Sequence, residues 1–171
     1  ERIVERKIAA GENYFLPYCI DYAAGSGHFI IEIMARVDAY VRSIVPSDLE
    51  KRTQRDNLGE WVHAMRWASE FVYGIEKDYR LAKTCKVSCF LNGDGDANIV
   101  NGDGLGHFTR DPDYQRAGGK LWRESASSAK DLGAFDVLVA NPPYSVAEFK
   151  RSVKAGSESF DLFDMVSDTS K

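Results

Sequence analysis

The chain has 171 residues and a mass of 19.1 kDa, with 44% hydrophobic and 28% charged residues. These fractions are close to globular averages and exclude a disordered tail, a collagen-like fibre and a disulfide-stabilised miniprotein. The net charge of −4 provides no overall positive field for nucleic acid or an anionic membrane, so any DNA contact must be local or come from a partner.

The three cysteines, Cys19, Cys85 and Cys89, indicate reduced thiols, because their number is odd and the last two lie four residues apart in a helical pattern. The histidines are scattered along the chain, so we expect no metal site. Apolar runs are too short to span a bilayer, and the first residues lack a signal-peptide core. We therefore expect a cytoplasmic protein with no membrane partner.

The two ends of the sequence indicate part of a longer polypeptide. The chain starts without a methionine, and residues 160–166 carry an amphipathic helical pattern just before the last residue, Lys171. We expect this segment to be the start of a helix that continues further.

The first third of the chain predicts a strand between two helices. A helical stretch over residues 1–10 precedes a short apolar run, 18–20, which ends on Asp21. Small residues over 23–27 predict a turn, and apolar residues then recur at helical spacing over 28–44.

The middle of the chain predicts two further strand and helix pairs. Residues 46–59 are polar and predict a surface connection, which leads into a helix over 60–70, and we interpret 46–70 as a helical insertion. A strand over 71–75 ends on Glu76, and a helix follows over 79–91. A third strand, 97–100, ends shortly before Asp103.

The last predicted strand follows a long, glycine-containing loop over residues 104–132. This strand, 135–140, must stop at the two prolines that follow, because proline cannot continue a central ladder. Strands that alternate with helices predict a parallel sheet, and ligands of such sheets bind at the carboxyl ends of the strands. This rule brings four polar residues to one edge: Asp21, Glu76, Asp103 and Asn141.

The segment from Asp21 to Phe29 joins an acid at a strand end to a glycine turn and a helix start. Glycines let the backbone approach a ligand closely, and the first turn of a helix presents unpaired N–H groups. A tight turn that binds nothing is the alternative. The acid four residues before Gly25 favours a ligand site.

Glu76 stands where an acid in a nucleotide-binding sheet accepts hydrogen bonds from ribose hydroxyls. It lies 49 residues after Gly27 rather than at the usual spacing of about 20, and the segment 46–70 accounts for the excess. A helix cap or a solvated charge is the alternative for both Glu76 and Asp103.

Two interpretations fit the sequence Asn141, Pro142, Pro143, Tyr144. It can simply end a strand with a proline turn, or it can hold the amine of a substrate. A conjugated amine becomes a better nucleophile when acceptors hold its protons. The Asn141 side-chain oxygen and the Pro142 carbonyl supply two such acceptors, and Tyr144 offers a ring for stacking on a planar base.

These residues resemble the amino-group DNA methyltransferases that use S-adenosylmethionine, and most closely the modification subunit of type I restriction-modification systems. Residues 21–27 resemble the family's cofactor motif, which usually reads Asp, Pro, Ala, Cys, Gly, Ser, Gly, although Tyr22 and Ala24 depart from it. Residues 141–144 match the catalytic motif, with the asparagine typical of adenine methylation. Residues 73–78 and 101–103 also resemble family phrases.

The resemblance implies an α/β, Rossmann-like class I methyltransferase fold, with a partial parallel sheet in the order 3-2-1-4 flanked by helices. Residues 1–171 would form a single partial catalytic domain. The residues implied for the cofactor are Asp21, Ala23, Gly25, Ser26, Gly27, Phe29, Glu76 and Asp103. Those implied for catalysis are Asn141, Pro142, Pro143 and Tyr144.

The implied reaction transfers a methyl group from S-adenosylmethionine to N6 of an adenine flipped out of double-stranded DNA. The implied partners are the specificity and restriction subunits of a type I complex in a bacterial or archaeal cytoplasm, and the fragment alone would be inactive. Two alternatives stay open: a methyltransferase for glutamine amides or RNA guanine amines, and a non-catalytic module that binds a specificity subunit. A dinucleotide-binding dehydrogenase ranks behind both, because the glycine pattern lacks the full fingerprint.

Overall fold

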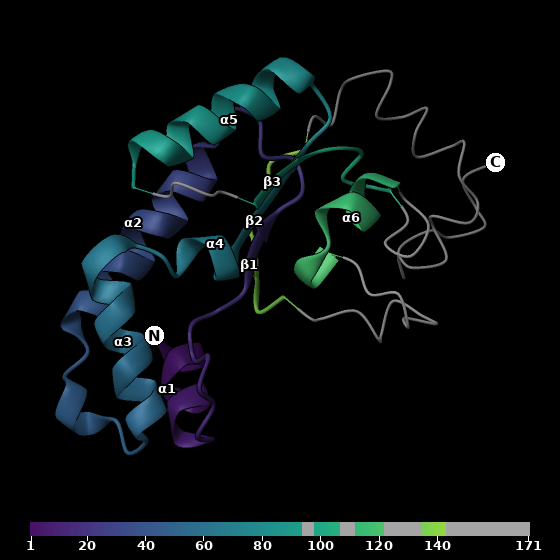
Figure 1. The fold of residues 1–171 in the computed structure, drawn as a ribbon. Helices are drawn as coiled ribbons and strands as arrows, with labels where there is room; N and C mark the ends of the chain where they lie inside the picture. The colour runs from purple at the N-terminus through teal and green to yellow at the C-terminus, as the bar shows by residue number, and fades with distance from the viewer. Residues whose placement is uncertain (94–97, 107–111, 122–134, 143–171) are drawn as a thin grey trace.

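A four-stranded parallel sheet forms the centre of the molecule in a computed structural model that describes residues 1–93, 98–106, 112–121 and 135–142 (Figure 1). The strand order is β3-β2-β1-β4. The strands span Cys19–Asp21 (β1), Val72–Glu76 (β2), Asn98–Asn101 (β3) and Val137–Leu138 (β4). The predicted α/β fold with the order 3-2-1-4 is therefore confirmed.

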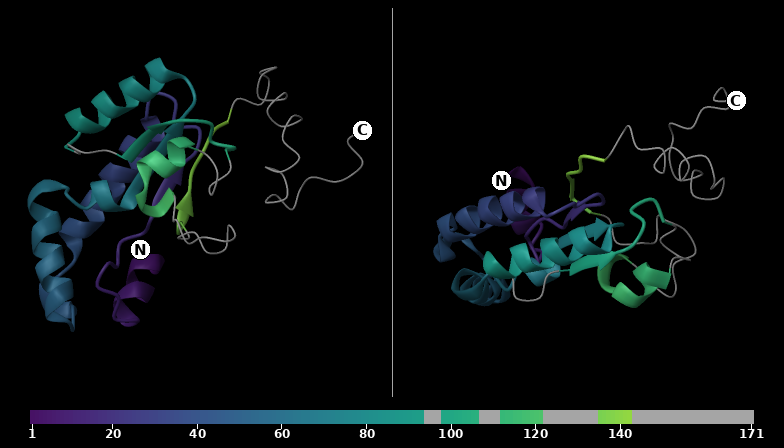
Figure 2. Two further views of the ribbon diagram at one scale, coloured as in Figure 1. Left: turned by 45° about the vertical axis from the view of Figure 1, so that its right-hand side comes forward. Right: turned by 90° about the horizontal axis from the view of Figure 1, so that it is seen from above.

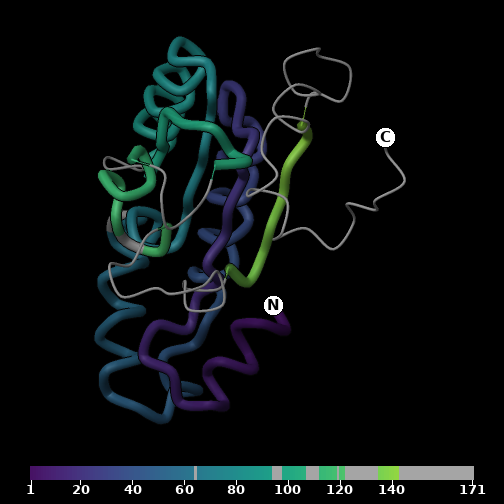
Figure 3. The backbone as a smooth tube through the Cα atoms, turned by 90° about the vertical axis from the view of Figure 1, so that its right-hand side faces the viewer, coloured from purple at the N-terminus to yellow at the C-terminus, as the bar shows by residue number. Residues whose placement is uncertain are grey.

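The register of the sheet fixes where the strands end. Asp21 is opposite Gly74, and Glu76 is opposite Asn101. On the other side of β1, Cys19 pairs with Val137 and Figure 3 shows β4 running beside β1. Because all four strands are parallel, their carboxyl ends share one edge of the sheet. This edge, which carries Asp21, Glu76 and Asn101, is called the carboxyl edge below.

Helices cover both faces of the sheet. The long helices α2 (His28–Ser43) and α5 (Tyr79–Leu91) lie together on one face, while α6 (Pro112–Ala117) packs beside β3 on the other (Figures 1 and 2). Each long helix buries one apolar stripe at helical spacing. The buried residues are Ile30, Met34 and Val41 in α2 and Ala82, Cys85 and Cys89 in α5.

A helical region lies at the amino ends of the strands. It comprises α1 (Arg2–Ala9), the 3₁₀ turn η1 (Pro46–Asp48), α3 (Arg52–Ala64) and α4 (Ala68–Phe71). The buried Gln54 amide joins α3 to α1, because it donates to the carbonyl oxygens of Glu12 at 2.9 Å and Ile8 at 3.4 Å. Within the described residues, no helix is long and apolar enough to cross a membrane.

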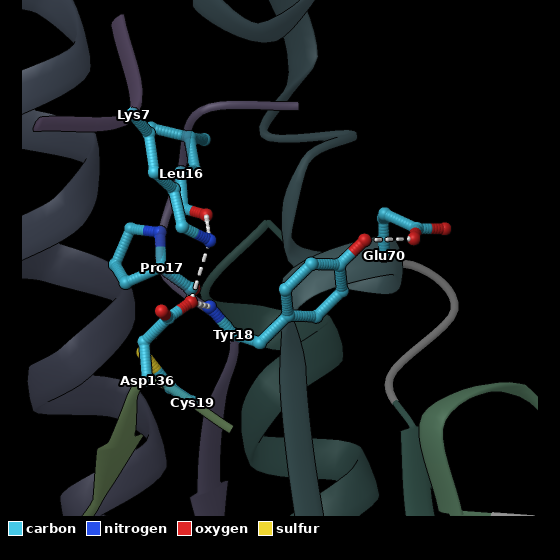
Figure 4. Close-up of polar contacts among 7 residues, drawn as sticks. All are labelled: Lys7, Leu16, Pro17, Tyr18, Cys19, Glu70 and Asp136. Carbon is cyan, nitrogen blue, oxygen red and sulfur yellow. Dashed lines mark hydrogen bonds and ion pairs between the residues drawn. The ribbon is translucent and has the colours of Figure 1, made fainter. Parts of the chain in front are cut away.

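A polar network at the amino ends of β1 and β4 connects α1 to these two strands (Figure 4). The Lys7 ammonium, on a side chain only 9% exposed, lies 2.6 Å from Asp136 Oδ2 and donates to the Leu16 carbonyl at 3.3 Å. The same carboxylate oxygen accepts the Tyr18 N–H at 2.9 Å. The Tyr18 hydroxyl donates to Glu70 at 2.6 Å, and burial together with this bond raises the pKa of Tyr18. The network sets where β1 and β4 begin.

Several element boundaries differ from the sequence-based expectation. The helix predicted over 60–70 begins already at Arg52, where the Gln54 side chain accepts the Lys51 N–H at 3.3 Å and Leu58 is buried. It ends at Ala64 because Met65 adopts a left-handed conformation with φ of 47°, so α4 is a separate turn. Residues 46–70 are thus largely helical, and their status as an insertion stays a prediction.

The second half of the chain also differs in detail. β4 comprises only Val137 and Leu138 of the strand predicted over 135–140, and Leu138 is 64% exposed at the end of the described sheet. The segment predicted as a loop, 104–132, contains α6 and the 3₁₀ turn η2 (Gly119–Leu121). Residues 107–111 and 122–134 of that segment, and the amphipathic pattern over 160–166, lie outside the described residues.

Candidate functional site

The glycine turn after β1 is held against the end of β2. Three backbone N–H groups define it: Ala24 donates to the Ile75 carbonyl at 3.0 Å, Gly25 to Glu76 Oε2 at 2.7 Å, and Gly27 to the Ala24 carbonyl at 2.8 Å. The turn is therefore tied to the neighbouring strand by both a backbone and a side-chain acceptor. It leads directly into α2, for which Gly27 is the N-cap.

The two glycines of this turn are needed for different reasons. Both have positive φ values, 55° at Gly25 and 95° at Gly27, a region that L side chains rarely adopt. A Cβ atom on Gly27 would lie 2.8 Å from the Sγ of the buried Cys85, so the turn packs tightly on α5. A Cβ atom on Gly25 would meet nothing within 4 Å. Gly25 therefore borders open space at the carboxyl edge.

Asp21 is a fully buried carboxylate at the end of β1. Its Oδ1 accepts the Ala23 N–H at 3.0 Å, while its buried Oδ2 has no hydrogen-bond partner among the described residues. Burial and the nearby Glu76 charge raise the pKa of Asp21, which the Ala23 N–H only partly offsets. A buried acceptor without a partner costs stability, and such groups are found where a ligand completes the bonding.

Glu76 links the glycine turn to the start of α5. Besides the bond from Gly25, its Oε1 accepts the Asp78 N–H at 2.8 Å. Asp78 in turn caps α5, and the N–H groups of Leu81 and Arg80 lower the pKa of its carboxyl group. The Glu76 carboxylate thus stands between the two helix starts on this face of the sheet.

Asp103 follows β3 and is joined to the same edge. Its Oδ1 accepts the Leu105 N–H at 3.1 Å, its Oδ2 lies 3.1 Å from the Lys77 ammonium, and its carbonyl accepts the Tyr114 hydroxyl at 2.5 Å. The adjoining Gly102 N–H donates to the Glu76 carbonyl at 3.1 Å. The structure therefore brings Asp21, the glycine turn, Glu76 and Asp103 together.

The remaining residues of the glycine turn and helix start face outward to different degrees. The Ser26 hydroxyl lies 3.0 Å from His28 Nδ1, and Phe29 is 42% exposed on the first turn of α2. Ala23 contributes its backbone N–H to Asp21. None of these three residues, Ala23, Ser26 and Phe29, is buried in the core.

Asn141 follows the outer strand β4 on the other side of β1. The Val139 N–H continues the ladder by donating to the Ile20 carbonyl at 3.0 Å. Asn141 follows two residues later, where the chain leaves the carboxyl end of β4. Asn141 is exposed and Pro142 is buried. Pro143 and Tyr144 lie outside the described residues, so their predicted roles stay predictions.

Two residues at this edge were given no role from the sequence. Lys77 is the cation beside Asp103. Gly104 packs so closely against Tyr22 that a Cβ at position 104 would overlap the Tyr22 carbonyl oxygen. The only sign in the sequence of the contact with Tyr22 was that residue 104 is a glycine. Across the described ranges, no group of three or more His, Cys, Asp or Glu residues could hold a metal ion.

The sequence matches the family model described as N-6 DNA Methylase over residues 17–170, which is most of the chain. The chain belongs to the N-6 DNA methylase family. A curated relative from Escherichia coli, described as Type II restriction enzyme and methyltransferase RM.Eco57I, is 26% identical over 183 aligned residues. That alignment covers 84% of this chain but only 17% of the relative. The family resemblance inferred from the motifs is thus confirmed at the level of N-6 DNA methylases.

Membership in the N-6 DNA methylase family implies S-adenosylmethionine as the methyl donor, and the carboxyl edge fits such a group. The Oδ2 of Asp21 is a buried acceptor without a partner among the described residues, and the open space beside Gly25 leaves room for a ligand against the backbone. Glu76 and Asp103 add two carboxylates for hydroxyl and amine donors.

Proposed function

We propose that the protein transfers a methyl group from S-adenosylmethionine to the N6 amino group of adenine in DNA. Membership in the N-6 DNA methylase family and the likeness to a restriction enzyme and methyltransferase support this reaction. The observation that carries the proposal is the strand order. The glycine turn follows β1, which lies between β2 and β4. Glu76 at the end of β2 is therefore on one side of the turn, and Asn141 after β4 is on the other.

In this proposal the carboxyl edge holds the cofactor along its length. Asp21 and the backbone of Ala23, Gly25, Ser26 and Gly27 would hold the methionine end, and Phe29 would line the same pocket. Glu76 would accept the ribose hydroxyls, and Asp103 the amino group of the cofactor's adenine. Carboxylates have about four lone-pair sites, so the backbone bonds that Glu76 already makes leave capacity for a ligand.

The target amine would be held on the other side of the glycine turn. The Asn141 side-chain oxygen and the Pro142 carbonyl would accept its two protons, and Tyr144 would stack on the flipped base with about 1–3 kcal/mol. When bound, S-adenosylmethionine supplies an electrophilic methyl group on a sulfonium. Asn141 and Pro142 would need only to hold the amine close to that methyl group and in line with it, so that a nitrogen–carbon bond could replace the carbon–sulfur bond while the amine gave up a proton to water.

The finer expectations remain proposals. These are the type I context with its specificity and restriction subunits, the cytoplasmic location and the inactivity of this segment alone. The curated relative is described as a type II enzyme, so it supports restriction-modification in general rather than the type I assembly. Labelled cofactor offered to DNA, RNA and protein substrates separates the proposed reaction from amide or RNA methylation. Calorimetry with S-adenosylhomocysteine tests the non-catalytic module, which predicts no heat.

The decisive experiment replaces Asn141 in the full-length protein. Asn141→Ala removes one acceptor for the target amine and leaves the glycine turn and Glu76 intact, so DNA methylation should be lost while S-adenosylhomocysteine binds as before. Asn141→Asp keeps an acceptor oxygen and should retain part of the activity. The control is Asn92→Ala at the exposed C-cap of α5, which should methylate normally. Full activity of Asn141→Ala would contradict the assigned role.

A further inference from the structure

Lys77 occupies an acceptor that the proposed function needs. It directly follows Glu76, and its ammonium lies 3.1 Å from Asp103 Oδ2, the carboxylate expected to accept an exocyclic amine. The other carboxylate oxygen, Oδ1, accepts the Leu105 N–H at 3.1 Å. Both oxygens of Asp103 therefore already have donors.

The backbone around this ion pair holds the two residues within reach of each other. The Asn101 amide donates to the carbonyl oxygens of both Glu76 and Lys77 at 3.0 Å, and the Gly102 N–H donates to Glu76 at 3.1 Å. The segment that follows β2 is thus fastened to the segment that follows β3. This bracing keeps the backbone of Lys77 close to that of Asp103, and their side chains meet in an ion pair.

We propose that Lys77 masks Asp103 and is displaced when a purine carrying an exocyclic amine binds, an inference that rests on the proposed function. The Lys77 ammonium takes one of the two lone pairs of Asp103 Oδ2 and neutralises the charge of the carboxylate, so it weakens the hydrogen bond that an exocyclic amine can make there. The pair is accessible to solvent, with side chains 58% exposed for Lys77 and 37% for Asp103. Exposed ion pairs are weak, so the mask lowers nucleoside affinity by about two- to fivefold without blocking the site.

The mask predicts an unusual dependence on salt. Dissolved ions screen an exposed ion pair, so raising the ionic strength makes Lys77 easier to displace. The gain in affinity on removing the Lys77 ammonium should therefore shrink as the salt concentration rises. A Lys77 that instead donated to the ligand would give no gain at any salt concentration.

The test is calorimetric titration of the full-length protein with S-adenosylhomocysteine at low and high salt. Lys77→Met keeps most of the aliphatic stem and removes the ammonium, so it should bind about two- to fivefold more tightly than wild type at low salt, and this difference should shrink at high salt. The matched control is Lys83→Met on α5, whose ammonium lies 4.5 Å from the Tyr79 ring centroid. It makes the same change in net charge and should leave the affinity unchanged.

The outcomes separate the mask from the proposed function. In an Asp103→Asn background the Lys77 substitution should have no effect, because the ion pair is already lost. Equal or weaker binding by Lys77→Met than by wild type overturns the mask but not the cofactor site. If neither wild type nor any variant releases heat, the cofactor site of the proposed function fails and the mask fails with it.

Discussion

The substitution Gly27→Ala tests how the glycine turn is built. Gly27 has φ of 95°, and an added Cβ would lie 2.8 Å from Cys85 Sγ and 3.4 Å from Cys85 Cα. The left-handed backbone costs an L residue about 1–2 kcal/mol, and overpacking a core position costs about 1–3 kcal/mol more. The expected loss in the free energy of unfolding is therefore about 2–5 kcal/mol.

Gly25→Ala is the matched control for this prediction. Its φ of 55° imposes the same kind of backbone strain, but an added Cβ meets no atom within 4 Å. Only the first cost applies, so we expect a loss of about 1–2 kcal/mol. The difference between the two variants isolates the contact with Cys85.

Urea unfolding followed by far-ultraviolet circular dichroism measures both losses, provided that the m value stays constant. Adding Cys85→Ala to Gly27→Ala should recover about 1 kcal/mol relative to the sum of the single losses, because the sulfur that the new methyl group meets is gone. Equal losses at Gly25 and Gly27, with additive behaviour of Cys85→Ala, would refute the packing argument.

Two further predictions concern buried charges. Asp21→Asn should stabilise the protein by about 1 kcal/mol at pH 7, because it removes a buried carboxylate with an unpartnered oxygen. The pKa of Asp21 is raised, so Asp21 in the folded protein takes up a proton before it does in the unfolded chain as the pH falls. The gain in unfolding free energy from Asp21→Asn, measured by urea titration, should therefore vanish near pH 4. A loss of unfolding free energy at pH 7 would contradict this prediction. Lys7→Met should lower the unfolding free energy by about 3 kcal/mol, since it leaves the largely buried Asp136 without its cation. Lys7→Met combined with Asp136→Asn should lose less than Lys7→Met alone, whereas additive losses would argue against a coupled pair.

The sequence predicted the sheet and the edge where its acids meet. Short apolar runs ending on Asp21 and Glu76, separated by helical periodicity, are enough to predict a parallel sheet, and the family resemblance implied the order of its strands. The carboxyl ends of parallel strands must share an edge, so the proximity of Glu76 to the glycine turn followed from topology. The resemblance to the family then predicted which turn and which acids form one site.

Tertiary contacts decided what the sequence could not show. The early start of α3 depends on Gln54, whose amide reaches α1, and its end depends on the left-handed Met65. The ion pair between Lys77 and Asp103 joins residues 26 apart in sequence, and neither residue type signals the other. The network of Lys7, Asp136 and Tyr18 spans a still longer separation and was not predicted.

The most direct test of the account is a crystal structure of the full-length protein with S-adenosylhomocysteine. The account predicts the homocysteine end at the turn formed by Gly25 and Gly27, the ribose at Glu76, and the sulfur facing the Asn141 side chain. A ligand bound elsewhere, or an Asn141 directed away from the sulfur, would contradict the proposed methyl transfer.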